Sequence, residues 1–192
     1  MPTAFRFTSK DLEELPRWEG VRWEIIEGEL YVSTAPHWNH QYVLGSIGCA
    51  LQTWDEAHEK GYSVTAPGLI LSPEDDVIPD VVWISRDRFR GALNDDGHLV
   101  VAPELIAEVV SPGAMHECRD RVAKLRLYSR HDVAEYWIVD WSARQVDMYR
   151  RIEGELRMIA TLSNGDVLTS PMVTGFECAV VSLWAPPIPG AG

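Results

Sequence analysis

Two apolar segments that each contain one acidic residue place the strongest constraint on how this chain folds. The first is Ile78–Ile84, which contains Asp80, and the second is Leu105–Val110, which contains Glu108. Segments this apolar are typical of central strands that are covered on both faces. A carboxylate there is costly unless a cation, a metal ion or strong hydrogen-bond donors compensate its charge. We therefore predict that the two acids share one site, most simply a divalent-cation site with oxygen ligands.

The composition limits the class of protein to which this chain belongs. Its 192 residues are enough for one folded domain, and no apolar run approaches the ~18 residues of a membrane span. Cys49, Cys118 and Cys178 are odd in number and widely spaced, and the first residues do not form a basic-then-apolar signal. We therefore expect a cytoplasmic protein with reduced thiols and no membrane partner.

The charge of the chain bears on its partners. There are 17 basic and 29 acidic residues, which give a formal net charge of −12. An acidic balance of this size is unfavourable for binding nucleic acid. The basic residues are unevenly distributed, however, because five of the 17 lie between Arg119 and Arg130. A local basic patch therefore still allows nucleic acid as a partner.

The order of predicted elements indicates one mixed α/β (α+β) domain over residues 1–192. The expected elements are a short capped helix over Thr8–Pro16, a hairpin over Trp23–Val32 with its turn near Glu27 and Gly28, a helix over His37–Lys60 that stops at Gly61, a strand over Tyr62–Leu71, a turn over Ser72–Asp76, the strand Ile78–Ile84, a short helix and loop over Arg86–Val101, the strand Leu105–Val110, a helix over Met115–Arg130, and strands over Ala134–Asp140 and Gln145–Tyr149. The core is expected at about residues 20–151, with further strands over 152–184 and a Pro/Gly tail over 185–192. This order predicts a central sheet flanked by helices, with an added N-terminal hairpin and C-terminal strands.

The helix predicted over Met115–Arg130 has packing residues on both faces. Lys124 lies on one face together with Asp120 and Tyr128, and Val122 lies on the other. If the first of these faces packs on the sheet, Lys124 points toward the two acids. If instead that face is solvated, Lys124 forms only an i, i+4 pair with Asp120.

Asp80, Glu108 and Lys124 together have the composition of a catalytic site. Two carboxylates can hold Mg²⁺ or Mn²⁺ and still leave coordination sites for water and a phosphate oxygen. The metal lowers the pKa of bound water and stabilises charge on the phosphate. A lysine beside that water can orient it and stabilise the transition state. The set therefore suits hydrolysis of a phosphodiester bond.

These residues and the motifs around them resemble the PD-(D/E)XK nuclease superfamily, and more closely its Uma-type branch of restriction-endonuclease-like bacterial proteins. The resembling segments, in order between about residues 15 and 151, are Trp23–Leu30, Pro36 to Gln41, Ile78–Asp80, Pro103–Pro112, Arg119 to Tyr128 and Val133–Asp140. The resemblance implies a restriction-endonuclease-like fold in which Asp80 and Glu108 bind the metal. Val110 stands where the superfamily has a lysine two residues after the acid. In the Uma-type branch a lysine from the following helix takes that place, which here implies Lys124.

Five further residues are candidates for supporting roles. His40 could contact a phosphate or orient a carboxylate, although a helix-start histidine without a function fits the pattern as well. Glu24 or Glu29 could supply a third acid near the metal, or both could be surface charges of the hairpin. Asp120 and Tyr128, one turn on either side of the lysine, could orient its ammonium group.

We therefore predict a Mg²⁺- or Mn²⁺-dependent endonuclease, a hydrolase whose substrate is nucleic acid, with DNA favoured. The alternative is a non-catalytic binding or assembly module on the same fold, for example a homo-oligomer formed through exposed strands and a Trp-rich surface. The acidic balance favours the module, whereas the presence of both acids and the lysine favours the enzyme. A melting curve with and without Mn²⁺ separates them, because a module without a metal site should not shift.

Overall fold

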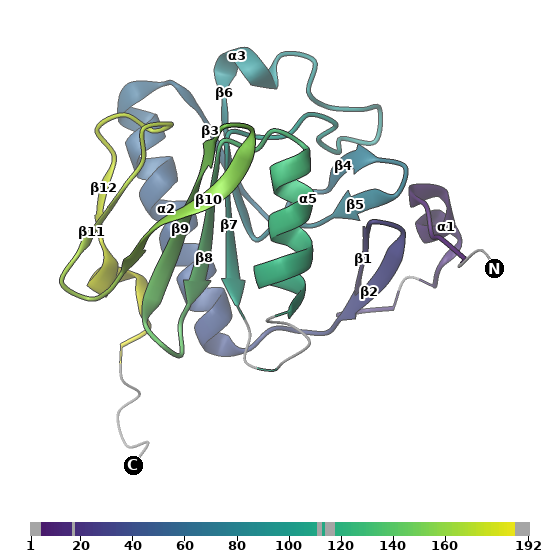
Figure 1. The fold of residues 1–192 in the computed structure, drawn as a ribbon, viewed down its shortest axis with the longest axis horizontal. Coiled ribbons are helices and arrows are strands. Elements are labelled where there is room, and N and C mark those ends of the chain that lie inside the picture. The colour runs from purple at the N-terminus through teal and green to yellow at the C-terminus, as the bar shows by residue number, and fades with distance from the viewer. Residues whose placement is uncertain (1–4, 17, 111–112, 114–117, 187–192) are drawn as a thin grey trace.

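The computed structural model describes residues 5–16, 18–110, 113 and 118–186. A six-stranded mixed sheet forms its centre, in the order β10-β9-β8-β7-β6-β3, and a four-stranded sheet, in the order β2-β1-β5-β4, lies beside it toward the N-terminus (Figure 1). The strands of the central sheet are β3 (Gly61–Thr65), β6 (Val81–Ser85), β7 (Leu105–Val110), β8 (Glu135–Asp140), β9 (Gln145–Ile152) and β10 (Glu155–Leu162). Those of the small sheet are β1 (Arg22–Ile26), β2 (Glu29–Ser33), β4 (Leu69–Ser72) and β5 (Asp75–Val77). The mixed sheet with an added hairpin confirms the predicted fold class.

Helices cover the central sheet on both faces, with α2 on one side and α5 on the other (Figure 1). The remaining elements are α1 (Ser9–Glu14), α2 (Trp38–His58), α3 (Arg86–Phe89), a π-helix η1 (Arg119–Lys124), α5 (Leu125–Arg130), the strand pair β11 (Val167–Thr169) and β12 (Glu177–Ala179), and a short helix η2 (Val180–Leu183). In the described part of the chain, no helix is both long and apolar enough to cross a membrane.

Alternating residues of the central strands build two separate cores. Leu105, Ala107 and Val109 of β7 pack in the cluster on the α2 side, whereas Ile106 and Val110 pack in the cluster on the α5 side. Every residue of β7 is buried, as expected for a central strand that is covered on both faces. β7 runs parallel to β8 and antiparallel to β6. The acid in β7 is therefore surrounded by protein, as its apolar neighbours predicted.

The N-terminal elements follow the local sequence signals. The Thr8 hydroxyl and the Thr8 backbone N–H both donate to the Asp11 carboxylate at 2.7 Å, which caps α1. The turn between β1 and β2 has Glu27 at φ 54° and Gly28 at φ 76°. Two consecutive positive φ angles are typical of the hairpin turns that suit the twist of paired strands. Both predicted elements are confirmed.

Four boundaries differ from the sequence expectations. α2 ends at His58 and is capped by Glu59, which adopts φ 53°, whereas Gly61 begins β3, where an added Cβ would lie 2.5 Å from the Ile84 carbonyl oxygen. The single strand expected over residues 62–71 is divided into β3 and β4, which belong to different sheets, because Ala66 at φ 51° breaks the extended chain. The turn expected over residues 72–76 includes the start of β5. Asp80 lies immediately before β6 rather than within it.

The helical segment that carries Lys124 packs on the sheet through the predicted face. Asp120, Lys124 and Tyr128 are buried, whereas Val122 is 49% exposed. The alternative of a solvated pair between Lys124 and Asp120 is therefore wrong. Residues 115–117, where the predicted helix begins, and 187–192, most of the predicted tail, lie outside the described residues.

Candidate active site

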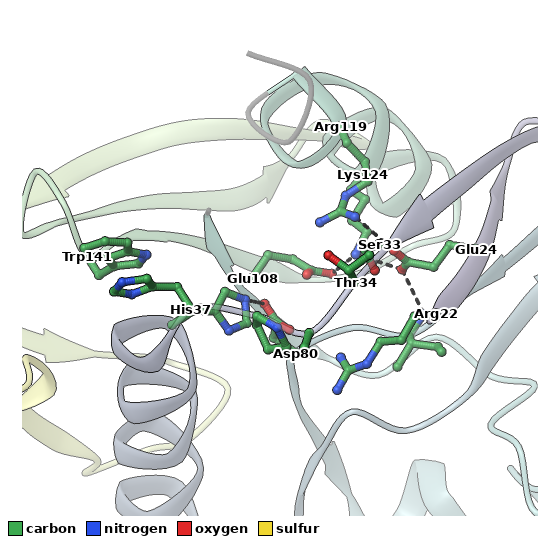
Figure 2. A pocket seen from close by; sticks show the side chains of 14 residues that line it. Arg22, Glu24, Ser33, Thr34, His37, Asp80, Glu108, Arg119, Lys124 and Trp141 are labelled. Carbon is green, nitrogen blue, oxygen red and sulfur yellow. Dashed lines mark hydrogen bonds and ion pairs between the residues drawn. The ribbon is translucent and has the colours of Figure 1, made fainter. Parts of the chain in front are cut away.

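A pocket of about 370 Å³ lies where the N-terminal hairpin, the start of α2, the central sheet and η1 meet. Asp80, Glu108 and Lys124 all line it, although they come from three separate elements (Figure 2). The register explains why the two acids are neighbours. Val81 of β6 pairs with Ala107 of β7 in an antiparallel ladder. Asp80, the residue before Val81, is therefore brought beside Glu108, the residue after Ala107.

Asp80 is held as a carboxylate at the end of the β6–β7 ladder. Its Oδ2 accepts a hydrogen bond from the Val109 backbone N–H at 2.8 Å and lies 3.2 Å from His40 Nε2. Burial opposes ionisation, but the hydrogen bond and charge of His40, the charge of Lys124 and the Val109 N–H together hold the pKa of Asp80 below its ordinary value. A stable carboxylate therefore faces the pocket at neutral pH.

The pKa of Glu108 shifts in the opposite direction to that of Asp80. Glu108 is 1% exposed, and its Oε1 accepts hydrogen bonds from Lys124 Nζ at 2.9 Å and from the Tyr128 hydroxyl at 2.7 Å. Burial raises the pKa of Glu108 to about 8, opposed by the charge of Lys124 and reinforced by the neighbouring charges of Asp80, Asp120 and Glu24. Glu108 therefore lies where negative charge exceeds the positive charge available to balance it.

Lys124 is a buried ammonium between two glutamates. Its Nζ lies 2.9 Å from Glu108 Oε1 and 3.0 Å from Glu24 Oε1, and the residue is 1% exposed. Burial lowers the pKa of Lys124, but the charges of Glu108 and Glu24 outweigh it, and the net direction is upward. The lysine comes from η1, a π-helical turn, which is a form found frequently at functional sites.

The structure separates the two glutamates that the sequence could not distinguish. Glu24 lines the pocket, where it also accepts a hydrogen bond from the Ile78 backbone N–H at 3.0 Å. Glu29 lies at the turn end of β2 with its side chain exposed, and its carboxylate accepts from the Tyr31 hydroxyl at 3.1 Å. The hairpin turn carries Glu29 away from the pocket, so of the two candidates only Glu24 lines it.

The other supporting candidates also lie near the pocket, and two of them, Asp120 and Tyr128, have partners that differ from the expected ones. Asp120 is buried and pairs with Arg119 at 2.8 Å rather than with Lys124. The Tyr128 hydroxyl binds Glu108 rather than facing the ammonium group. His40 lies within α2 against Asp80, and its Nδ1 is buried with no hydrogen-bond partner among the described residues. The ammonium group is thus oriented by two glutamates, not by its helical neighbours.

Two arginines and two ring-bearing residues of the pocket were not singled out from the sequence as site residues. Arg119 lines it and lies 3.4 Å from Glu24, while Arg22 reaches it from β1. His37 and Trp141 form a stacked pair on the side of the pocket next to β8 (Figure 2). The arginines have a weak sequence signal in the basic segment and the hairpin. His37 and Trp141 come from segments far apart in the chain, so no local sequence pattern predicts that they stack.

The charged groups around the pocket determine whether it could hold a small divalent cation. Four carboxylates, Glu24, Asp80, Glu108 and Asp120, are paired with Arg119, Lys124 and, at Asp80, His40. Burial raises the pKa of Glu108, and the other three carboxylates add to this rise. Among the described residues, no group of three or more His, Cys, Asp or Glu side chains is arranged to hold a metal ion. Two protein carboxylates with water and phosphate completing the coordination is, however, the usual arrangement for Mg²⁺.

Comparison with solved structures identifies the class of fold to which this chain belongs. A crystal structure described as "a putative nuclease belonging to DUF820 from Anabaena variabilis" superposes with a TM-score of 0.73 and 15% sequence identity, covering 92% of this chain and 97% of that one. At this identity the similarity shows that the nuclease-like fold is shared. Residues 10–181 match the model of the Uma2 family, described as "Putative restriction endonuclease". The chain therefore belongs to the Uma2 family, which confirms the predicted resemblance. No curated protein matches the sequence.

Proposed function

We propose that this protein is a Mg²⁺- or Mn²⁺-dependent endonuclease that hydrolyses phosphodiester bonds of nucleic acid in the pocket. The observation that supports this most directly is the meeting of Asp80, Glu108 and Lys124 in one pocket with an excess of buried negative charge. A structural ion pair would balance its charges, because an uncompensated buried carboxylate is costly. Membership of a family described as restriction endonucleases supports the same reaction.

Asp80 and Glu108 would hold the metal, which when bound polarises the phosphate and activates water for attack. Lys124 lies within hydrogen-bond distance of Glu108, so its ammonium would stabilise the charge that develops on the phosphate. The Glu24 carboxylate and the Tyr128 hydroxyl fix the positions of Lys124 and Glu108 respectively. His40 orients the Asp80 carboxylate through Nε2. Each reacting group is thus held by a second side chain before the substrate arrives.

Metal binding is tested by the melting temperature in EDTA and in Mn²⁺. The wild-type protein should gain about 5–10 °C at a Mn²⁺ concentration 100 times the Kd, because a ligand that binds only the folded state stabilises it by mass action. Glu108→Gln should abolish the gain. Glu29→Gln is the matched control, since it makes the same change on the exposed end of the hairpin, and it should keep the gain. An equal gain in all three proteins would place the metal elsewhere.

Cleavage of labelled single- and double-stranded DNA in Mn²⁺ tests the chemistry. Lys124→Met should lower the rate by roughly 10²-fold or more, the scale of losing one electrostatic stabiliser. Lys124→Arg should not restore the full rate, because a planar guanidinium replaces a compact ammonium. Lys60→Met, at an exposed lysine outside the pocket, should leave it unchanged. Equal nonzero rates in wild type and Lys124→Met would remove Lys124 from the reaction.

The second candidate function is a non-catalytic binding or assembly module on the same fold. The observation in its favour is that Lys124 itself bridges Glu24 and Glu108, so part of the negative charge is neutralised without a metal. This function predicts a folded wild-type protein that shows neither a Mn²⁺-dependent rise in melting temperature nor cleavage of any strand. Either signal, if lost in Glu108→Gln, argues for the endonuclease.

A further inference from the structure

The stacked pair of His37 and Trp141 lines the pocket and has no role in the proposed reaction. The two rings are parallel to within 4°, with centroids 4.9 Å apart. Trp141 directly follows β8 and packs, partly buried, against the core on the α2 side. His37 caps the N-terminus of α2, where its Nδ1 accepts a hydrogen bond from the Asn39 backbone N–H at 3.1 Å. One face and one nitrogen of the His37 ring are therefore fixed.

The part of this pair that is available to a ligand is the His37 ring. The side chain of His37 is exposed, and the Nδ1 bond leaves the proton of the neutral ring on Nε2 as a donor. Trp141 Nε1 is buried without a hydrogen-bond partner among the described residues. In Figure 2 this nitrogen lies on the edge of the indole ring nearer to Glu108. An exposed ring that is held rigidly and carries an Nε2–H donor is suited to stacking with a flat ring that has acceptor atoms.

Arg22 supplies a positive charge at the same pocket. Its side chain lines the pocket from β1 and makes no hydrogen bond or ion pair within the part of the chain that the structure describes. Arg119 and Lys124, by contrast, are both paired with carboxylates. The pocket thus combines one aromatic surface with one uncommitted guanidinium, which matches one base and one phosphate.

The volume of the pocket and the net charge of the chain favour a single strand over a duplex as the ligand. A volume of about 370 Å³ is near the lower end of the range for small-ligand sites, which accommodates a group such as one nucleotide. Duplex binding draws on many phosphate contacts from basic side chains, whereas this chain carries a net charge of −12. Binding of unpaired bases adds stacking on aromatic side chains to the phosphate contacts, so part of its affinity does not come from cations.

We propose that the pocket takes one unstacked nucleotide of a single-stranded nucleic acid, with the base on His37, backed by Trp141, and a phosphate on Arg22. The preferred substrate is then a single strand, flap or loop rather than a paired duplex. The inference rests on the proposed endonuclease function for the identity of the reacting phosphate, which would lie next to Asp80 and Glu108, two residues that line the same pocket.

The test is fluorescence anisotropy with a labelled oligothymidylate strand and with its duplex, in Ca²⁺, with intact probe verified by electrophoresis. His37→Asn removes the ring but keeps an N-cap acceptor, so the fold is retained. It should weaken binding of the strand at least about fivefold, the lower limit for losing one stacked base. Trp141→Phe keeps an aromatic ring against His37 and loses the indole N–H together with part of the ring area, so it should weaken binding by a smaller factor.

The protein contains a matched control pair. Trp54 and His58 are also stacked, with centroids 4.3 Å apart, and Trp54 Nε1 is also buried without a partner in the described residues, but neither lines the pocket. His58→Asn and Trp54→Phe should therefore leave the affinity for the strand unchanged. A loss of affinity equal to that of the pocket variants would mean that the effect is one of stability and would overturn the inference.

Three further outcomes overturn the inference: tighter binding of the duplex than of the strand, wild-type affinity in His37→Asn, or no binding of the strand. These outcomes are distinguishable from failure of the endonuclease proposal. His37→Asn leaves Asp80 and Glu108 in place, so it should keep the Mn²⁺-dependent rise in melting temperature. If that rise and cleavage of duplex persist while strand binding does not depend on His37, only the substrate inference fails. If wild type shows no rise, the endonuclease proposal fails first.

Discussion

Two clusters of charged side chains join the small N-terminal sheet to the helical segment that follows β7, and they differ in balance. The pocket cluster, defined by Glu24, Asp80, Glu108, Arg119, Asp120 and Lys124, is buried and has more carboxylates than cations. The surface network, defined by Glu27, Asp75, Arg126, Arg130 and His131, pairs two carboxylates with two arginines. Arg126 and Arg130 have 63% and 49% of their side chains exposed.

The pKa values of the acids reflect this difference. In the surface network, burial raises the pKa of Asp75, but hydrogen bonds from the Glu27 backbone N–H, Ser72 and His131, with the charge of Arg130, lower it overall. In the pocket cluster, burial dominates and the pKa of Glu108 rises to about 8. The surface network therefore stabilises the ionised form of Asp75, whereas in the pocket cluster the negative charge of Glu108 is poorly compensated. Such a stability cost is expected where a site has been selected to bind something else.

The largest effect should come from removing the buried cation of the pocket cluster. Lys124→Met keeps an apolar stem and leaves Glu24 and Glu108 without their shared partner. The free energy of unfolding should fall by about 3–5 kcal/mol, the range for breaking a buried ion pair from one side. Urea denaturation at neutral pH in EDTA measures it. A loss below about 0.5 kcal/mol, the value for an exposed pair, would contradict the buried geometry.

A smaller effect should appear in the pH dependence of stability. Because the folded-state pKa of Glu108 is raised from 4.5 to about 8, the folded state binds more protons than the unfolded state between these values. Stability is then lost as pH rises through that window. Glu108→Gln should remove this slope and, in metal-free buffer at pH 8, gain on the order of 2 kcal/mol relative to wild type. Urea midpoints at pH 5.5 and 8 measure it.

The matched variant of the surface network should respond in the opposite direction. The pKa of Asp75 is lowered, so its contribution is present above the ordinary aspartate pKa and lost as pH falls into the acid range. Asp75→Asn should therefore flatten the acid side of the stability profile and leave the slope between pH 5.5 and 8 intact. If both variants changed the same pH window, the contrast between the two clusters would be wrong.

The smallest effect should follow from removing a cation of the surface network. Arg130→Ala breaks ion pairs to Glu27 and Asp75 that are partly exposed. It should lower the free energy of unfolding by about 0.5–1 kcal/mol at low salt and by less at high salt, because exposed pairs are screened. Arg157→Ala, which breaks an exposed pair with Glu153, is the control. Thermal denaturation of both variants at two salt concentrations measures the two losses. A loss in Arg130→Ala that does not depend on salt would indicate that its ion pairs are buried.

The local parts of the site were predictable from the sequence. An isolated acid in an apolar run marks Glu108, and the helical period places Lys124 on the face with Tyr128. The remainder depends on contacts between distant segments. Glu24 and Glu29 have the same local pattern, and only the packing of the hairpin against η1 distinguishes them. The break in the predicted strand over residues 62–71 has the same origin, because the two halves find partners in different sheets.

The π-helical turn η1 allows the number of residues in this segment to vary without loss of the pocket. Its hydrogen bonds span one residue more than those of an α-helix. Deleting one residue between Asp120 and Lys124 would restore the α-helical spacing and leave Arg119 four and Asp120 three positions before Lys124. Side chains at these spacings share one face of an α-helix. A homologue one residue shorter here would therefore keep each charged residue of the motif and also their meeting point.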